Sequence, residues 1–155
     1  MKSNWKQITN VKVTAFDLDG NIKDVQEFHN LITTVGLGMV IDVLWGALGD
    51  GEIKDMAIGD DNTDPVLANT TLGNETDRWT MTTQAEASTT SLLSVVYIAP
   101  SEAVYQIEEI GWFAGAGCDG VGPDTGIMVS RVLYSRNKTA IESLQIERLD
   151  TMAEA

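Results

Sequence analysis

The second half of the chain is a succession of strand-like runs with no helical segment between them. Residues that favour strands, chiefly Val, Ile, Thr, Tyr and Trp, are concentrated in five runs: 78–86, 90–99, 104–114, 126–136 and 141–149. Gly, Pro, Ser and Asn separate the runs, and Val95 with Tyr97 shows the alternation of a strand. Consecutive strands without intervening helices predict antiparallel pairing, as in a β-sandwich.

Two further elements precede these strands. Residues 11–28 form two extended runs around Asp19-Gly20, and an Asp-Gly pair between strands is typical of a β-hairpin turn. Thr33-Thr34 offers a helix N-cap, and apolar residues then recur at helical spacing as far as Leu48. We therefore predict one helix over about residues 33–48, ended by Gly49-Asp50-Gly51, with its apolar face packed on the sheets. A short strand is expected at 53–58.

These elements together predict the fold class: a mostly β, antiparallel β-sandwich with an N-terminal β-hairpin and one α-helix. A chain of 155 residues has the size of one domain, so we expect residues 1–155 to fold as a single unit, with the antiparallel strands in 78–149. The first residues lack the pattern of a secretion signal, and no apolar segment is long enough to cross a membrane. We expect synthesis in a cytoplasm and no membrane partner.

The charge of the chain excludes one large class of function. Acidic side chains outnumber basic ones 23 to 10, which gives a formal net charge of −13. Such a field repels phosphate backbones, and the few cations are scattered, so we expect no nucleic-acid partner. Cys118 is the single cysteine and lies in a Gly-rich stretch. It therefore has no partner for an internal disulfide, and a zinc site is not expected.

One motif points to an enzyme and has to be weighed against the fold. The stretch Phe-Asp-Leu-Asp-Gly-Asn resembles the first motif of haloacid-dehalogenase phosphohydrolases. That resemblance implies Asp17 as nucleophile, Asp19 as general acid/base, and Asp60 or Asp61 as Mg²⁺ ligand. The family needs a parallel sheet with several βα units between these motifs, each of roughly 30 residues, and the chain has no room for them. We therefore predict no enzyme and no cofactor, with a small Mg²⁺-dependent phosphohydrolase as the alternative.

Other chemistry-bearing residues are interpreted as structural. Four oxygen-bearing side chains in one turn are candidate Ca²⁺ ligands: Asp60, Asp61, Asn62 and Asp64. This turn lacks the glycine and the glutamate that complete an EF-hand loop, so we predict a solvated turn and no metal site. His29 is the only histidine, and Ser130 lies inside an expected strand. We therefore predict no catalytic residues.

Contact surfaces are expected at one strand and two loops. Trp112 and Phe113 are adjacent, so on a strand they point to opposite faces and one of them is expected to face outward. The loops 59–77 and 114–126 are the other candidates, because binding residues concentrate on loops held by a rigid scaffold. The predicted interface residues are Trp112, Phe113, Asp119, Asp124, Asn74 and Glu75.

The order of short signals along residues 20–150 resembles that of short bacteriophage tail-fibre-like and related virion proteins. The segments that carry the resemblance are His29–Thr33, Gly36-Leu37, Met56–Asp60, Leu72–Glu75, Arg78, Ile107–Phe113, Gly126–Arg131 and Lys138-Thr139. The resemblance implies a non-enzymatic virion structural protein of the tail fibre or baseplate, located in the virion. It also implies self-assembly, as a trimer, and binding to other virion proteins.

Two other functions stay open alongside this one. A domain of this size without a fibre shaft equally suits a capsid decoration protein on the head. A glycan- or receptor-binding module using loop aromatics is a third possibility, and the sequence has no feature that decides it.

Overall fold

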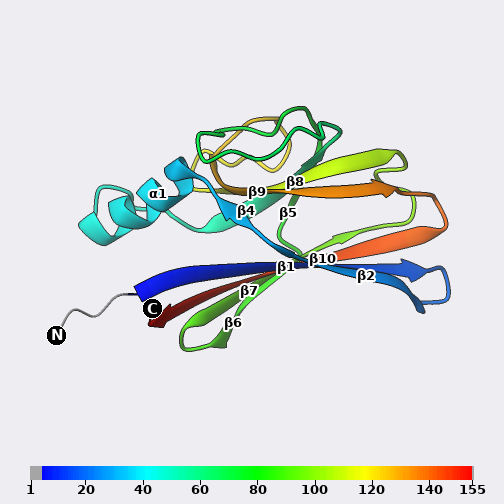
Figure 1. Ribbon diagram of the computed structural model, residues 1–155, viewed down its shortest axis with the longest axis horizontal. Helices are drawn as coiled ribbons and strands as arrows, with labels where there is room; N and C mark the ends of the chain where they lie inside the picture. Colours follow the sequence, from blue (N-terminus) through cyan, green and yellow to red (C-terminus); the bar gives the residue numbers. More distant parts are fainter. Residues whose placement is uncertain (1–4, 155) are drawn as a thin grey trace. The chain divides into compact units, whose positions relative to one another are not determined.

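The computed structural model describes residues 5–154 and shows a mostly β chain with one helix (Figure 1). In chain order the elements are β1 (Trp5–Asp17), β2 (Ile22–His29), β3 (Leu31–Ile32), α1 (Thr34–Trp45), β4 (Ile53–Gly59), β5 (Glu75–Thr80), β6 (Thr83–Ser88), β7 (Ser91–Ile98), β8 (Gln106–Ala114), β9 (Ile127–Asn137) and β10 (Glu142–Glu154). The strands form two five-stranded antiparallel sheets, β2-β1-β10-β7-β6 and β3-β9-β8-β4-β5. This confirms the predicted fold class, and two such sheets are consistent with a β-sandwich.

The described residues fall into two compact units, each built on one sheet. The first unit comprises residues 5–30, 81–102 and 140–154, and the second comprises 31–80 and 103–139. The single domain expected over residues 1–155 stays a prediction. Within residues 5–154, no helix combines the length and apolar content needed to cross a membrane.

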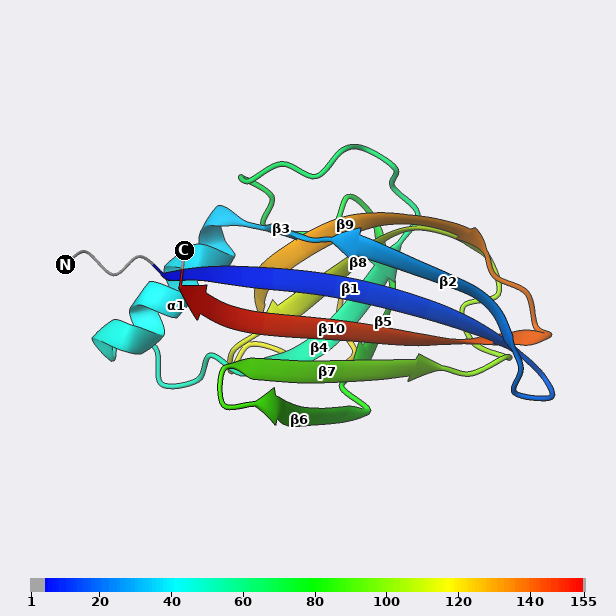
Figure 2. The same ribbon diagram turned by 60° about the horizontal axis from the view of Figure 1, so that its bottom comes forward.

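The first unit contains the predicted N-terminal hairpin. Figure 2 shows its strands side by side in the order β2, β1, β10, β7 and β6. Strand β1 pairs with both β2 and β10, and its alternate residues Val11, Val13 and Ala15 are buried. The β1–β2 turn places Gly20 at a φ of 83°, where glycine is favoured. The Asp-Gly pair therefore correctly predicted the hairpin.

The second unit is built around the paired strands β4 and β8. Met56, Ala57 and Ile58 of β4 are fully buried in succession, so both faces of this strand are covered. Strand β8 is also buried on both faces, at Ile110 and at Trp112 with Phe113. The sequence of a strand that is buried on both faces is a continuous apolar run and does not alternate between apolar and polar residues.

Several strand boundaries differ from the prediction, including the start of β1 at Trp5 instead of residue 11. The run expected at 78–86 is two strands, because the chain turns at residues 81–82 and passes from β5 in one sheet to β6 in the other. The Thr82 amide donates to the Val95 carbonyl just before β6 begins. Strand β10 continues to Glu154, because β1 pairs with it over its whole length.

Helix α1 begins as predicted and ends earlier. Thr33 is the N-cap, and its hydroxyl accepts a hydrogen bond from the Gly36 amide at 3.0 Å. Gly46 takes the left-handed conformation, with a φ of 76°, and its amide bonds the carbonyls of the last turn. Glycine at this position stops a helix at minimal steric cost. The predicted stop at residues 49–51 is therefore wrong by one turn.

Candidate functional site

The outer surface of α1 carries several exposed apolar side chains. Leu37, Ile41, Leu44 and Trp45 follow the i, i+4, i+7, i+8 spacing of one helix face, here named the α1 outer face. Leu44 is 69% exposed and Trp45 is 83% exposed. Asp42 is the only charged residue between Thr34 and Trp45. Soluble helices ordinarily present charged side chains to water, so this apolar surface is typical of a binding surface.

The opposite side of α1 packs on β9, and the N-cap fixes this orientation. The Thr33 hydroxyl donates to the Met128 carbonyl at 2.6 Å, and the Thr33 amide donates to the Val129 carbonyl. Gly36 then approaches so closely that a Cβ there would overlap the Val129 backbone. Gly36 and Met39 are consequently the buried residues of the helix. The prediction that residues such as Leu44 pack on the sheet is therefore wrong.

The two long loops of the second unit cover one face of its sheet (Figure 1). Phe113 of β8 packs in a buried cluster with Ala57, Met128 and Leu72, and Leu72 comes from the loop between β4 and β5. Cys118 of the β8–β9 loop packs against the same cluster. The loops are thus closed onto the sheet by apolar anchors.

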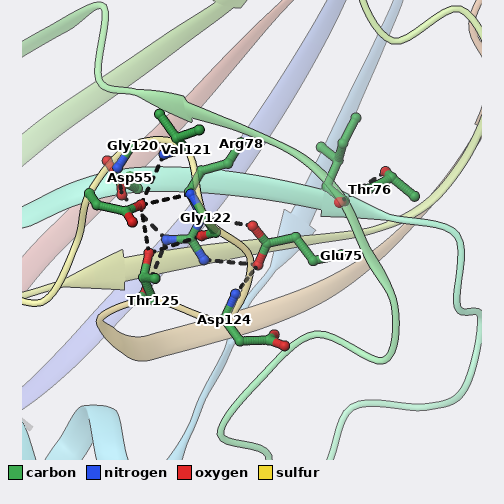
Figure 3. A network of polar contacts seen from close by, with 11 residues as sticks. Asp55, Glu75, Thr76, Arg78, Gly120, Val121, Gly122, Asp124 and Thr125 are labelled. Carbon is green, nitrogen blue, oxygen red and sulfur yellow. Dashed lines mark hydrogen bonds and ion pairs between the residues drawn. The ribbon is translucent and has the colours of Figure 1, made fainter.

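A group of buried charges holds the β8–β9 loop in place (Figure 3). The Arg78 guanidinium donates to both carboxylate oxygens of Glu75, at 2.7 and 2.8 Å, to the Thr125 carbonyl and to Asp55. The side chains of Arg78 and Asp55 are each 1% exposed. Arg78 also lies over the Phe113 ring, 4.0 Å from its centroid. We name Arg78, Glu75 and Asp55 the Arg78 clamp.

The clamp binds the loop through its backbone as well. The Gly120 amide donates to Asp55 at 3.0 Å, and the Asp124 amide donates to Glu75 at 3.0 Å. Asp119 closes the loop internally, because its carboxylate accepts from the backbone amides of Val121 and Gly122 and from the Thr125 hydroxyl. Those backbone hydrogen bonds hold the pKa of Asp119 below its usual value. The loop is therefore an ordered structure.

A second buried pair positions the β4–β5 loop. Glu109 and Arg131 are 0% and 2% exposed, and the Arg131 Nε donates to Glu109 at 2.6 Å. Glu109 also accepts from the backbone amides of Gly73 and Asn74. One carboxylate thus ties two sheet strands to the loop that carries Leu72.

The predicted interface residues have mixed positions in the structure. Trp112 and Phe113 are both buried, so the prediction that one of them faces outward is wrong. The reason at Phe113 is the loop layer, which covers the face of the sheet that this residue occupies. Asp119 and Asp124 are exposed and near each other in the β8–β9 loop. Glu75 belongs to the Arg78 clamp.

Asn74 and the acidic turn are tied to one another. The Asn74 side-chain amide donates to Asp60 at 2.6 Å, and Asp61 accepts from the Thr63 amide. The hydrogen bonds of Thr63, with the charge of Arg131, lower the pKa of Asp61. The other two Ca²⁺ candidates, Asn62 and Asp64, lie in the same turn. Across residues 5–154, no group of three or more His, Cys, Asp or Glu side chains is placed to hold a metal ion.

Asp17 of the phosphohydrolase-like motif serves the hairpin turn. Its carboxylate accepts from the backbone amides of Asp19 and Asn21 and from the Asn21 side chain, at 2.8–3.0 Å. These bonds, with that of the Asn21 side chain the largest, lower the pKa of Asp17. The residue lies at the end of an antiparallel strand. The Asp17 carboxylate thus holds the turn together, and Asp19 takes part through its backbone amide.

The first unit also contains an open groove of about 560 Å³ over its sheet. The lining residues are Asn10, Val11, Lys12, Glu27, Phe28, His29, Leu93, Glu147 and Leu149. Lys12 pairs there with Glu147, at 2.6 Å between Nζ and Oε2. The predicted structural role of His29 is compatible with its position at the end of β2.

The comparisons with known proteins give one uniform result. No family model matches the chain, and no curated protein or solved structure matches it.

Proposed function

We propose that the chain is a non-enzymatic structural protein of a bacteriophage virion, which assembles with copies of itself and binds other virion proteins. It would be made in the host cytoplasm and reside in the tail fibre or baseplate, with capsid decoration as the alternative position. The resemblance in the order of sequence signals motivates the virion assignment, and the α1 outer face motivates the assembly role.

The single observation that carries the proposal is the exposure of α1. Leu37, Ile41, Leu44 and Trp45 remain in contact with water although the rest of the helix supplies almost no charge. Exposed apolar patches on a soluble protein typically mark a surface that a partner covers. A protein with such an exposed apolar helix face is suited to assembly.

The charged groups of the second unit support a structural interpretation over a catalytic one. The Arg78 clamp holds the β8–β9 loop, and the Glu109–Arg131 pair holds the β4–β5 loop. The Arg78 guanidinium bonds Glu75, Asp55 and the Thr125 carbonyl, and the Glu109 carboxylate accepts from Arg131 and from two backbone amides. Such networks fix a unique conformation.

The direct test is the copy number of the protein in purified particles from its source, by quantitative mass spectrometry against the major capsid protein. We expect a few to a few dozen copies, which would place the protein on the tail. A number comparable with the capsid protein would support decoration of the head. Absence from the particles would contradict the proposal.

A phosphatase assay tests the alternative of another class. The purified chain with Mg²⁺ is expected to leave a generic aryl phosphate intact. Hydrolysis that is lost in Asp17→Asn would instead assign the motif its catalytic role. Asp24→Asn, on the same hairpin, is the matched control for a change that merely disturbs β2.

A further inference from the structure

We propose that the partner of the α1 outer face is the same helix of a second copy, packed antiparallel about a two-fold axis. This inference rests on the proposed assembly function and names the partner of its surface. It proposes a dimer in place of the trimer that the sequence resemblance implies. Three features of the described residues lead to a second copy: the shape of the apolar face, its lack of charge, and the ends of the helix.

The apolar side chains of α1 surround the helix instead of lining one stripe. Gly36 lies against Val129 of β9, Met39 is also buried, and the α1 outer face lies on the other side. A helix that is apolar all round is normally covered all round. The four side chains lie on one helix of 12 residues, about 18 Å long, which matches the contact length of another helix of the same kind.

Charge makes the α1 outer face the place where two copies can meet. The chain carries a net charge of −13, so two copies repel each other over most of their surfaces. The segment Thr34–Trp45 contains one charged residue, Asp42. A surface without cations has nothing to offer to an acidic partner in ion pairs, and few anions for a basic one. It is suited to another nearly uncharged apolar surface, such as the same helix face of a second copy.

The ends of α1 favour the antiparallel arrangement. Within Thr34–Trp45 the first turn has no acidic side chain and the last turn has no basic one. The partial positive charge of the helix N-terminus and the negative charge of its C-terminus are therefore not offset by its own side chains. An antiparallel copy would place each end beside the opposite end of its partner. A two-fold axis produces this pairing with one surface used twice.

The contact would extend slightly beyond the helix. The Thr34 amide donates to the Leu67 carbonyl at 2.8 Å, so the segment Val66-Leu67 adjoins the start of α1. The side chains of Val66 and Leu67 are 53% and 55% exposed. The apolar contact would be confined to one 12-residue helix and these two residues, which is a small contact for a protein–protein interface. We therefore expect a dissociation constant in the range of about 10–100 µM.

The test is sedimentation velocity of the whole chain between about 1 µM and about 1 mM. We expect a shift from monomer to dimer, and a stronger dimer at higher salt because salt screens the repulsion between two acidic copies. The double variant Leu44→Gln with Trp45→Gln should weaken the dimer by about tenfold or more, since buried apolar anchors dominate such contacts. Glutamine keeps the net charge and the helix propensity, so the change tests apolar contact alone.

The matched control is Val121→Gln with Ile141→Gln. These side chains are 85% and 61% exposed and lie outside α1, so the control should dimerise like the unmodified chain. Circular dichroism of both double variants verifies that the fold is retained. A monomer at every concentration and salt, equal weakening by both double variants, or a trimer would each overturn the inference.

The outcome is separable from that of the proposed function. A monomeric chain that is nevertheless found in particles would remove the second copy as partner and leave the structural role. A dimer that is absent from particles would retain the helix contact and remove the role.

Discussion

The β8–β9 loop and helix α1 belong to the same unit, and each meets solvent in the opposite way from what its composition predicts. The loop around Asp119 and Asp124 is polar and rich in glycine, yet it is held on the sheet through Gly120 and Thr125. Helix α1 is almost entirely apolar, yet Leu44 and Trp45 remain exposed.

The difference shows that partners supplied by the strands decide which segments are covered. Asp55 on β4 and Glu75 on β5 pair with Arg78 and also accept hydrogen bonds from the loop amides of Gly120 and Asp124. Strand β9 contacts helix α1 closely at Gly36, whereas the α1 outer face remains exposed. The closed loop is therefore a feature of the fold, whereas the open helix points to a partner.

The largest expected effect comes from breaking the Arg78 clamp. Arg78→Met removes the bonds to Glu75, Asp55 and Thr125 and leaves buried carboxylates without their cation. Removing one partner of a buried ion pair destabilises a protein by about 3–5 kcal/mol. Chemical denaturation followed by circular dichroism measures this loss.

Arg78→Lys is the control for charge alone. Lysine keeps the cation but lacks the planar fork that reaches both oxygens of Glu75. We expect an intermediate loss of stability. A change below about 1 kcal/mol in Arg78→Met, the size of an exposed pair, would contradict the role of the clamp.

The closed loop can be probed next through its thiol. Burial, with the charge of Asp55, raises the pKa of Cys118 to about 11. A raised pKa keeps the thiol neutral at lower pH, so the reactive thiolate appears only as the pH approaches that value. At pH 8 alkylation should be roughly a hundredfold slower than for an unperturbed thiol.

The same reaction reports on the clamp. In Arg78→Lys the loop is expected to open more often, so alkylation of Cys118 should accelerate. Denaturant should restore the rate of an ordinary thiol in both proteins. Equal rates in the folded and the denatured chain at pH 8 would show that the loop does not cover Cys118.

A smaller effect distinguishes the two sides of α1. Gly36→Ala would place a methyl group against the Val129 backbone, and overpacking of this kind costs about 1–3 kcal/mol. Gly38→Ala meets nothing within 4 Å and should stabilise the helix by up to about 1 kcal/mol. Thermal unfolding of the two variants is the measurement, and effects of the same sign would contradict the observed orientation of the helix.

The sequence predicted the elements whose signals are local. The Asp-Gly pair located the hairpin, Thr33 located the start of the helix, and the density of β-branched residues located most strands. The break at residues 81–82 could not be predicted, because the change of sheet depends on pairing with Val95, which is distant in sequence.

The site was less predictable, because its partners are distant in the sequence. Asp55, Glu109 and Arg131 are charged residues inside apolar strands, and a buried charge requires a partner. Charged residues inside apolar strands therefore predict buried ion pairs, but they do not predict which loop packs over each pair. The sequence also did not show which face of α1 packs on the sheet, because apolar residues surround the helix. The close contact of Gly36 with Val129 determines that face.

The most direct test of the contrast between the closed loop and the open helix is amide hydrogen exchange across the chain at a low and a high protein concentration. Exchange reports the local opening of hydrogen-bonded amides. The amides of Gly120, Gly122 and Asp124 donate to carboxylates and should be protected equally at both concentrations.

Residues 34–46 should instead become more protected as the concentration rises, since a second copy would then cover the helix. Loop amides that exchange as fast as in an unfolded peptide would contradict the clamp. Helix protection that does not depend on concentration would contradict the proposal that copies of this chain assemble through α1.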